Sequence, residues 1–200
     1  MSGFDSDSDS FGSLSIFLGP MFSGKTTKLI ERYAHYTKKG VKVLAINYSK
    51  DTRYTSEPFM VSHDKTSIPC ILVSRLSEAF SQEDDDADKD RINRFMESDV
   101  VLINECHFFP DIVEWVKMVV TIYKKKVYIC GLNGDFERRP FGNWMDLISF
   151  CDSVTKLHSD CNVCKTNNAI FSYRISDKKE QIIIGNGYIP LCRQCFEFIA

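Results

Sequence analysis

The sequence has no apolar run that approaches the roughly 20 residues of a membrane-spanning helix. Its first residues are acidic and polar, with aspartates among serines, and do not resemble a secretory signal. A concentrated basic stripe is also lacking, which argues against binding to a nucleic-acid polymer. We therefore expect a cytoplasmic protein that binds neither membranes nor nucleic-acid polymers.

The small net charge of −2 conceals an uneven distribution of acids. Three aspartates lie in the first ten residues, and six acids lie between Glu83 and Asp90, a run that we interpret as a mobile surface insertion. Without these nine acids and Lys89, 24 of the 25 basic residues and 18 of the 27 acidic residues remain. The body of the chain is therefore basic enough to suit a small anionic substrate.

An octapeptide near the start of the chain fits the phosphate-binding pattern G-x-x-x-x-G-K-[ST]. Its residues are Gly19, Pro20, Met21, Phe22, Ser23, Gly24, Lys25 and Thr26. An apolar run at 14–18 predicts the strand that must enter such a loop, and 26–39 has helical spacing before Gly40 ends it. Because this context is present, we favour a polyphosphate cradle over a chance match, with Thr26 offering its hydroxyl to Mg²⁺.

Further strands are predicted at 41–46, 70–73, 99–103 and 127–132, separated by helical segments at 74–80, 91–97, 112–119 and 144–150. Strands that alternate with helices predict a parallel, doubly wound α/β sheet. We assign 13–155 to this P-loop nucleotide-binding domain and 1–12 to a disordered acidic tail, and expect Asp111 to cap the helix after it.

Several polar residues follow the predicted strands, at the sheet edge where open α/β folds bind ligands. Asp51 and Arg53 follow the second strand, and Asn104-Glu105 follows the buried run 99–103. We expect Glu105 to be functional and to lie beside the strand of the phosphate loop, because a carboxylate there is costly unless it is used or paired. Two adjacent arginines in the loop 133–142 suit phosphate charge or a solvated surface equally well.

The C-terminal part of the chain carries two C-x-x-C pairs separated by the 27 residues 165–191. The four cysteines are Cys161, Cys164, Cys192 and Cys195. Four thiolates complete a tetrahedral Zn²⁺ site and leave no open position, so the metal would be structural; a redox pair is the alternative. Runs at 170–175 and 181–184 predict a hairpin, so 156–200 reads as a small zinc-ribbon-like domain. The other four cysteines (Cys70, Cys106, Cys130 and Cys151) are expected to be buried thiols.

Together these motifs resemble the thymidine kinases of the cellular and poxviral type (type II). The resemblance rests on Gly19–Thr26, Lys50–Tyr54, Glu105 with Phe108–Asp111, 134–142, and the two cysteine pairs with Tyr188 between them. It extends from about residue 15 to 196. It implies transfer of the γ-phosphoryl of ATP to the 5′-hydroxyl of thymidine, giving dTMP and ADP for nucleotide salvage.

The resemblance also implies roles for individual residues. Glu105 would be the general base, and Asp51 and Arg53 the charged pair near the phosphates and the 5′ position. Phe108 would stack on the thymine, and a lasso loop at about 181–191 would cover the nucleoside. The remaining substrate-binding positions would be Met21, Leu132, Phe136, Phe141, Ser172 and Tyr188. Such enzymes use ATP with Mg²⁺, form homotetramers and are inhibited by dTTP.

The sequence departs from the family pattern at a few positions. Asn104 stands where the family has Asp before the catalytic Glu, which removes a negative charge near Mg²⁺. Cys106-His107 replaces Gly-Gln, Ser172 replaces a common Thr, and Glu137 replaces a Gln. His107 could titrate near neutral pH or serve the structure alone. Two alternatives therefore remain open: a non-catalytic P-loop nucleotide-binding module, and a deoxynucleoside kinase with a broader pyrimidine preference.

Overall fold

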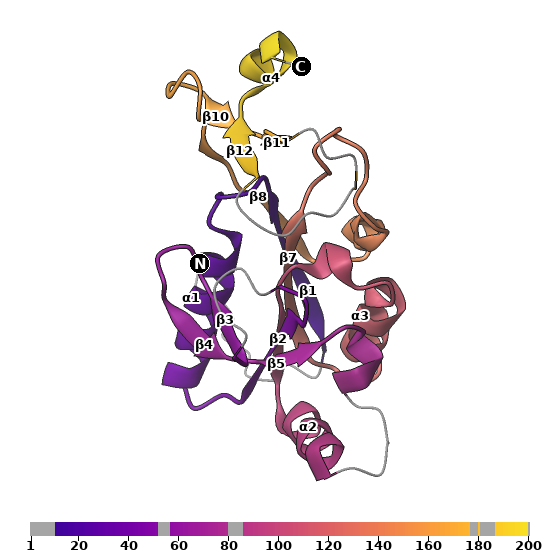
Figure 1. The fold of residues 1–200 in the computed structure, drawn as a ribbon. Coiled ribbons are helices and arrows are strands. Elements are labelled where there is room, and N and C mark those ends of the chain that lie inside the picture. Colours follow the sequence, from indigo (N-terminus) through magenta and orange to yellow (C-terminus); the bar gives the residue numbers. More distant parts are fainter. Residues whose placement is uncertain (1–10, 52–56, 80–85, 177–179, 181–186, 200) are drawn as a thin grey trace, which may run out of the picture.

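We analysed a computed structural model of the chain, which describes residues 11–51, 57–79, 86–176, 180 and 187–199. The predicted tail at 1–12 lies almost wholly outside these residues, as do Arg53 and most of the predicted lasso. The body consists of a sheet with helices packed on it. A smaller unit of short strands and one helix continues from the upper end of the body (Figure 1).

A six-stranded sheet forms the body, and all its pairings are parallel, as predicted. Its order is β5-β2-β6-β7-β1-β8. The strands are β1 (Ser13–Gly19), β2 (Val43–Tyr48), β5 (Ile71–Val73), β6 (Val100–Ile103), β7 (Lys126–Leu132) and β8 (Ser153–Lys156). The edge strand β8 was not predicted, because all four of its residues are exposed and none of the apolar signal of a buried strand is present.

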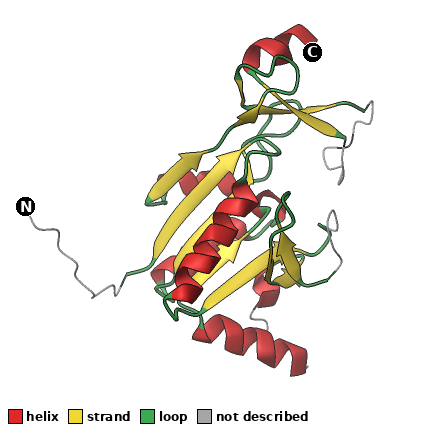
Figure 2. Ribbon diagram, turned by 90° about the vertical axis from the view of Figure 1, so that its left-hand side faces the viewer, coloured by secondary structure: helices red, strands yellow, loops and turns green. Residues whose placement is uncertain are grey.

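Helices cover both faces of the sheet, so successive side chains of each central strand are buried on opposite sides. The helix α1 (Lys25–Lys38) lies on one face and α3 (Ile112–Thr121) on the other (Figures 1 and 2). Leu14 and Ile16 of β1 belong to the core under α3, whereas Phe17 belongs to the core under α1. This double burial explains why the central strands read as continuous apolar runs.

Other segments of the body differ from the sequence-based expectation. The helix α2 (Asp86–Glu97) begins inside the acidic run, so the second half of the predicted insertion is the first part of a helix. The strands β3 (Phe59–Val61) and β4 (Ser67–Pro69) form a hairpin that the sequence patterns did not predict.

Within the described part of the chain, three segments adopt short 3₁₀ helices: η1 (Leu76–Ala79), η2 (Cys106–Phe108) and η3 (Trp144–Ser149). Asp111 stands at the start of α3 as predicted, but its carboxylate makes no capping bond to that helix. It instead accepts the backbone N–H groups of Leu76 and Ser77 at 3.1 and 2.9 Å. The side chain therefore caps η1, a distant segment, and fixes α3 against it.

The C-terminal unit contains β9 (Ser159–Asp160), β10 (Asn168–Ala169), β11 (Phe171–Arg174), β12 (Tyr188–Leu191) and α4 (Arg193–Ile199). The predicted hairpin strand 170–175 is confirmed as β11. Its partner among the described residues is β12, in antiparallel register from Phe171↔Leu191 to Arg174↔Tyr188. Residues 188–191, which we had assigned to the lasso, are thus strand, while 181–184 lies outside the described residues.

Candidate active site and metal centre

The phosphate loop lies between β1 and α1, as the motif requires. The Lys25 Nζ donates to the Pro20 carbonyl at 2.6 Å, and the Ser23 hydroxyl donates to the same oxygen at 2.8 Å. A side chain at Gly19 would come within 2.5 Å of the Leu157 carbonyl, so only glycine fits. Gly24 has a φ of 79°, which glycine adopts without strain. The loop is therefore held closed by its own residues around a buried lysine.

Thr26, in the first turn of α1, is tied to the end of β6. Its hydroxyl donates to the Asn104 Oδ1 at 3.1 Å. The Asn104 Nδ2 donates to the Asn47 Oδ1 at 3.0 Å, and the Cys130 thiol donates to the Asn104 Oδ1 at 3.0 Å. Asn104 thus joins α1, β2, β6 and β7 through uncharged groups. Because the Thr26 proton is directed at Asn104, the lone pairs of its hydroxyl remain available to a cation, and oxygen ligands of this kind suit Mg²⁺.

Glu105 follows β6 at the same edge of the sheet as the phosphate loop, and is 8% exposed. We expected β6 to lie beside β1, and this is wrong: β7 lies between them. The phosphate loop is nevertheless linked to the end of β6, because Thr26, on the helix that follows the loop, donates a hydrogen bond across β7 to Asn104. Glu105 has φ 51° and ψ 41°, a left-handed conformation that is uncommon for a residue with a side chain. Such a backbone is typical of functional positions.

His107 lies against Glu105 with a fully buried side chain. Its Nδ1 accepts the backbone N–H of Leu132 at 3.3 Å, and its Nε2 is 3.6 Å from the Glu105 Oε2. Since Nδ1 is an acceptor, a neutral ring carries its proton on Nε2, on the side of the carboxylate. His107 is therefore a buried part of the core whose Nε2 approaches the Glu105 carboxylate; sequence reasoning had left its role open.

Aromatic rings pack together beside His107 and the residue that follows it. Phe108 stacks on Tyr48 with ring centroids 4.9 Å apart, and meets Phe141 edge-on at 5.5 Å. His107 lies 4.6 Å from the Phe141 ring. Phe108 and Phe141, which are both predicted substrate-binding positions, are thus in contact. Tyr48 was missed, although it is the last residue of a buried strand at the ligand-binding edge of the sheet.

The other predicted substrate positions lie where the C-terminal unit meets the body. The Met21 N–H of the phosphate loop donates to the Ser172 Oγ of β11 at 2.9 Å. Phe136, in the loop after β7, and Tyr188, in β12, both contact Arg174, a buried residue that sequence reasoning did not single out. Leu132, the last residue of β7, donates its N–H to His107.

The two arginines of the loop 133–142 form ion pairs with acidic side chains, and Arg53 lies outside the described residues. Arg138 pairs with Glu197, and its guanidinium lies 4.7 Å from the Phe196 ring centroid. Arg139 pairs with Asp135 at 3.2 Å and also with Glu137. Both arginines thus serve the connection to the C-terminal unit or their own loop. Asp51 follows β2, with its N–H on the Tyr48 carbonyl at 3.0 Å.

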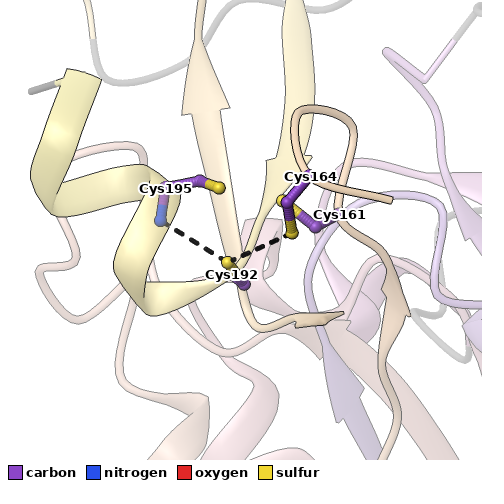
Figure 3. Close-up of side chains that lie close together, drawn as sticks. All are labelled: Cys161, Cys164, Cys192 and Cys195. Atoms are coloured by element: carbon purple, nitrogen blue, oxygen red, sulfur yellow. Dashed lines mark hydrogen bonds between the residues drawn. The ribbon is translucent and has the colours of Figure 1, made fainter. Parts of the chain in front are cut away.

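The four cysteines of the two C-x-x-C pairs converge on one point (Figure 3). Their sulfur atoms all lie within 4.8 Å of one another. Zn–S bonds of about 2.3 Å place the sulfurs of a tetrahedral site about 3.8 Å apart. The sulfurs of Cys164 and Cys192 are 3.9 Å apart, so the cluster could bind a structural metal with this geometry.

The surroundings of two of these thiols shift their pKa values in opposite directions. Hydrogen bonds from the Thr166 side chain and from the backbone N–H groups of Thr166 and Asn167 lower the pKa of Cys164 to about 5. Partial burial and the neighbouring cysteine sulfurs raise the pKa of Cys195 to about 12. Without a cation, four thiolates this close would repel one another. A metal ion supplies the charge that lets all four ionise.

The fold and this edge of the sheet define the class of the protein as a P-loop nucleotide-binding α/β protein. A family model described as "Thymidine kinase" matches residues 12–196. Thymidine kinase 1 of Dictyostelium discoideum is 37% identical over 193 residues, covering 92% of this chain and 78% of the relative. Thymidine kinase of Yaba monkey tumor virus is 39% identical over 187 residues, covering 92% and 94%. The cytosolic thymidine kinase of Homo sapiens is 34% identical over 197 residues, covering 96% and 76%. The chain belongs to the thymidine kinase family.

Among the described residues, no helix is both long enough and apolar enough to cross a membrane.

Proposed function

We propose that the protein transfers the γ-phosphoryl of ATP to the 5′-hydroxyl of thymidine, giving dTMP and ADP. One observation carries the proposal: the buried Glu105 carboxylate follows β6 at the sheet edge that also holds the phosphate loop, with His107 3.6 Å from it. A protein that only binds nucleotide has no need of such a carboxylate. Membership of the thymidine kinase family selects thymidine as the acceptor.

At the phosphate end, catalysis requires positioning and neutralisation of charge. The backbone of residues 19–26 and the N-terminus of α1 would cradle the β- and γ-phosphates, with Lys25 released from Pro20 to contact them. Mg²⁺, when bound, would supply further positive charge beside Thr26 and Asn104. Because Asn104 brings no negative charge, we expect weaker Mg²⁺ binding than an aspartate would give.

At the nucleoside end, Glu105 would accept the proton of the 5′-hydroxyl as that oxygen attacks the γ-phosphorus. The Nε2–H of His107 would hold the carboxylate in one orientation during this transfer. Phe108 presents an aromatic face for the base, with Tyr48 and Phe141 fixing its ring. Met21, Leu132, Phe136, Ser172 and Tyr188 would line the rest of the nucleoside site. Arg53 and Asp51 would act near the 5′ position.

ADP release, measured with ATP and Mg²⁺ in the presence and absence of thymidine, tests the proposal. We expect release to depend on thymidine. Binding of ATP without thymidine-dependent release would instead favour the non-catalytic module. Parallel rates with thymidine, deoxyuridine and deoxycytidine decide the pyrimidine preference, and equal rates on all three would favour the broader deoxynucleoside kinase.

The metal, the domain division and the assembly are further parts of this proposal. We assign Zn²⁺ to the four cysteines because the sulfur spacing suits its tetrahedral geometry. Residues 13–155 would form the nucleotide-binding domain and 156–200 the zinc domain. The cytosolic human relative supports a cytoplasmic location. A homotetramer and inhibition by dTTP are expected from the family resemblance, and sedimentation and inhibition assays test them.

A further inference from the structure

Arg174, at the end of β11, is a buried arginine at the junction of three segments, and only 5% of it is exposed. Its Nε donates to the Tyr188 Oη at 3.2 Å, and its Nη2 donates to the same hydroxyl. Its Nη1 donates to the Glu180 carbonyl at 2.5 Å. The guanidinium carbon lies 3.6 Å from the centroid of the Phe136 ring.

These contacts suit a guanidinium better than any other side chain. Burying a cation is costly unless its donors are satisfied. The planar fork meets this need by directing two N–H groups at one hydroxyl and a third at a backbone carbonyl, while its flat face lies on an aromatic ring. A lysine ammonium could not make the stacked and forked contacts together.

Arg174 connects the C-terminal unit to the body of the protein. Tyr188 is its cross-strand partner in the β11–β12 hairpin, whereas Phe136 belongs to the loop that follows β7 of the body. Ser172, two residues earlier, is also buried, and therefore lies on the same face of β11. That residue bonds to Met21 of the phosphate loop at 2.9 Å. One face of β11 thus contacts both the loop after β7 and the phosphate loop.

We propose that Arg174 is a positioning residue of the nucleoside site, which holds the Phe136 and Tyr188 rings in the orientation that thymidine requires. The inference rests on the proposed function, because it takes these two rings as part of the nucleoside site. Arg174 itself acts through the rings. Its loss should therefore affect thymidine more than ATP, whose phosphates are held by the phosphate loop.

Steady-state kinetics of Arg174→Met, Arg174→Lys, Tyr188→Phe and the Arg174→Met/Tyr188→Phe double variant test this role. We expect Arg174→Met to raise the KM for thymidine about 10- to 100-fold, and Tyr188→Phe about tenfold, since hydrogen bonds to a charged group are strong. The KM for ATP should change less than about threefold. The double variant should be no worse than Arg174→Met, because both changes break one contact. Arg174→Lys should stay within about threefold of the Met variant, because charge without the planar fork does not restore the contacts.

Arg193→Met is the matched control, because the Arg193 guanidinium also lies over an aromatic ring, 5.2 Å from the Phe171 centroid, but on the exposed side of the C-terminal unit. It should leave both KM values unchanged. Amide hydrogen exchange should speed up at 133–142 and at 187–191 in Arg174→Met and not in the control. Zinc content should equal that of the wild type in all variants.

Three results separate the possible outcomes. A thymidine KM that does not change in Arg174→Met overturns the positioning role. A parallel loss of kcat, ATP binding and zinc also overturns it, since it shows a residue that only stabilises the fold. Absence of thymidine-dependent ADP release from the wild-type protein refutes the proposed function itself, whereas an active wild type with unaffected variants refutes the Arg174 assignment alone.

Discussion

The phosphate loop and the four-cysteine centre are held in place by different physical means. The loop follows β1, whose residues 14–18 are mostly buried within a six-stranded sheet between two helical layers. The core of the C-terminal unit consists of Cys161, Ala169, Leu191, Cys192 and Phe196. Two of these five buried residues are members of the cysteine cluster. Apolar burial can thus hold the first region, whereas the second has only a small core, which a metal bound by the four cysteines could complete.

Removal of the metal should have the largest effect, because it should unfold one of the two regions and leave the other folded. Apparent binding free energies of structural zinc sites are on the order of 10 kcal/mol or more, and small metal domains unfold without the ion. We expect Cys164→Ser, or chelation of the wild type, to unfold the region after about residue 156 while the sheet persists. Metal analysis, limited proteolysis and circular dichroism measure this.

Cys151→Ser is the matched control, because Cys151 is partly exposed and lies outside the cluster. It should keep its metal and its C-terminal unit. Full zinc content in Cys164→Ser, or a C-terminal unit that resists proteolysis after complete chelation, would contradict the dependence on metal.

The next largest effect is expected at the nucleoside end, from Glu105→Gln. The amide keeps the size of the side chain but cannot accept the proton of the 5′-hydroxyl. General bases contribute typically 10²–10⁴-fold, so kcat should fall by about that factor while both KM values stay near those of the wild type. Steady-state kinetics and thymidine titration provide the measurement, and turnover equal to the wild type would refute the role of Glu105.

A smaller change tests the uncharged network that holds Thr26. Asn104→Asp would let the Thr26 hydroxyl donate to a carboxylate and would add negative charge beside the cation. We expect Mg²⁺ to bind about three- to tenfold more tightly in the presence of ATP, because charge-assisted hydrogen bonds and ion contacts are stronger than neutral ones. Titration of Mg²⁺ against bound nucleotide reports the affinity directly.

Asn168→Asp makes the same charge change at an exposed position in β10 and should leave Mg²⁺ binding unaltered. Without Mg²⁺, the Asn104→Asp variant should unfold more easily than the wild type, because its new charge is buried. Unchanged Mg²⁺ affinity together with unchanged stability would show that Asn104 does not face the cation.

The smallest predicted effect concerns the hydrogen bond that joins the two regions. Ser172→Ala removes the acceptor of the Met21 N–H, and a neutral hydrogen bond contributes about 1 kcal/mol. We expect the free energy of unfolding to fall by about that amount, and the KM for thymidine to rise about fivefold or less. Ser172→Thr keeps the hydroxyl and should behave like the wild type. Urea denaturation and kinetics measure both quantities, and equal losses in the Ala and Thr variants would exclude a role for the bond.

Features encoded by contiguous residues were predictable. The central strands appear as continuous apolar runs because parallel strands are buried on both faces. The spacing of residues alone predicted a phosphate loop at 19–26 and a metal site at the two cysteine pairs. Segments whose secondary structure depends on contacts with remote parts of the chain were not predictable. The strand β8 is exposed, β12 lies where a loop was expected, and part of the acidic run is helical.

By itself the sequence determined the phosphate loop, the carboxylate at the end of a buried strand and the four cysteines, because each is specified by local order. Only the tertiary structure decided which groups meet. Ser172 reaches Met21 across 151 positions of the chain, and Arg174 joins Phe136 to Tyr188. The Nε2 of His107 faces Glu105 because its Nδ1 accepts the Leu132 N–H of β7, a strand that is distant in the sequence. Contacts of this kind depend on the packing of remote segments, which no local pattern records.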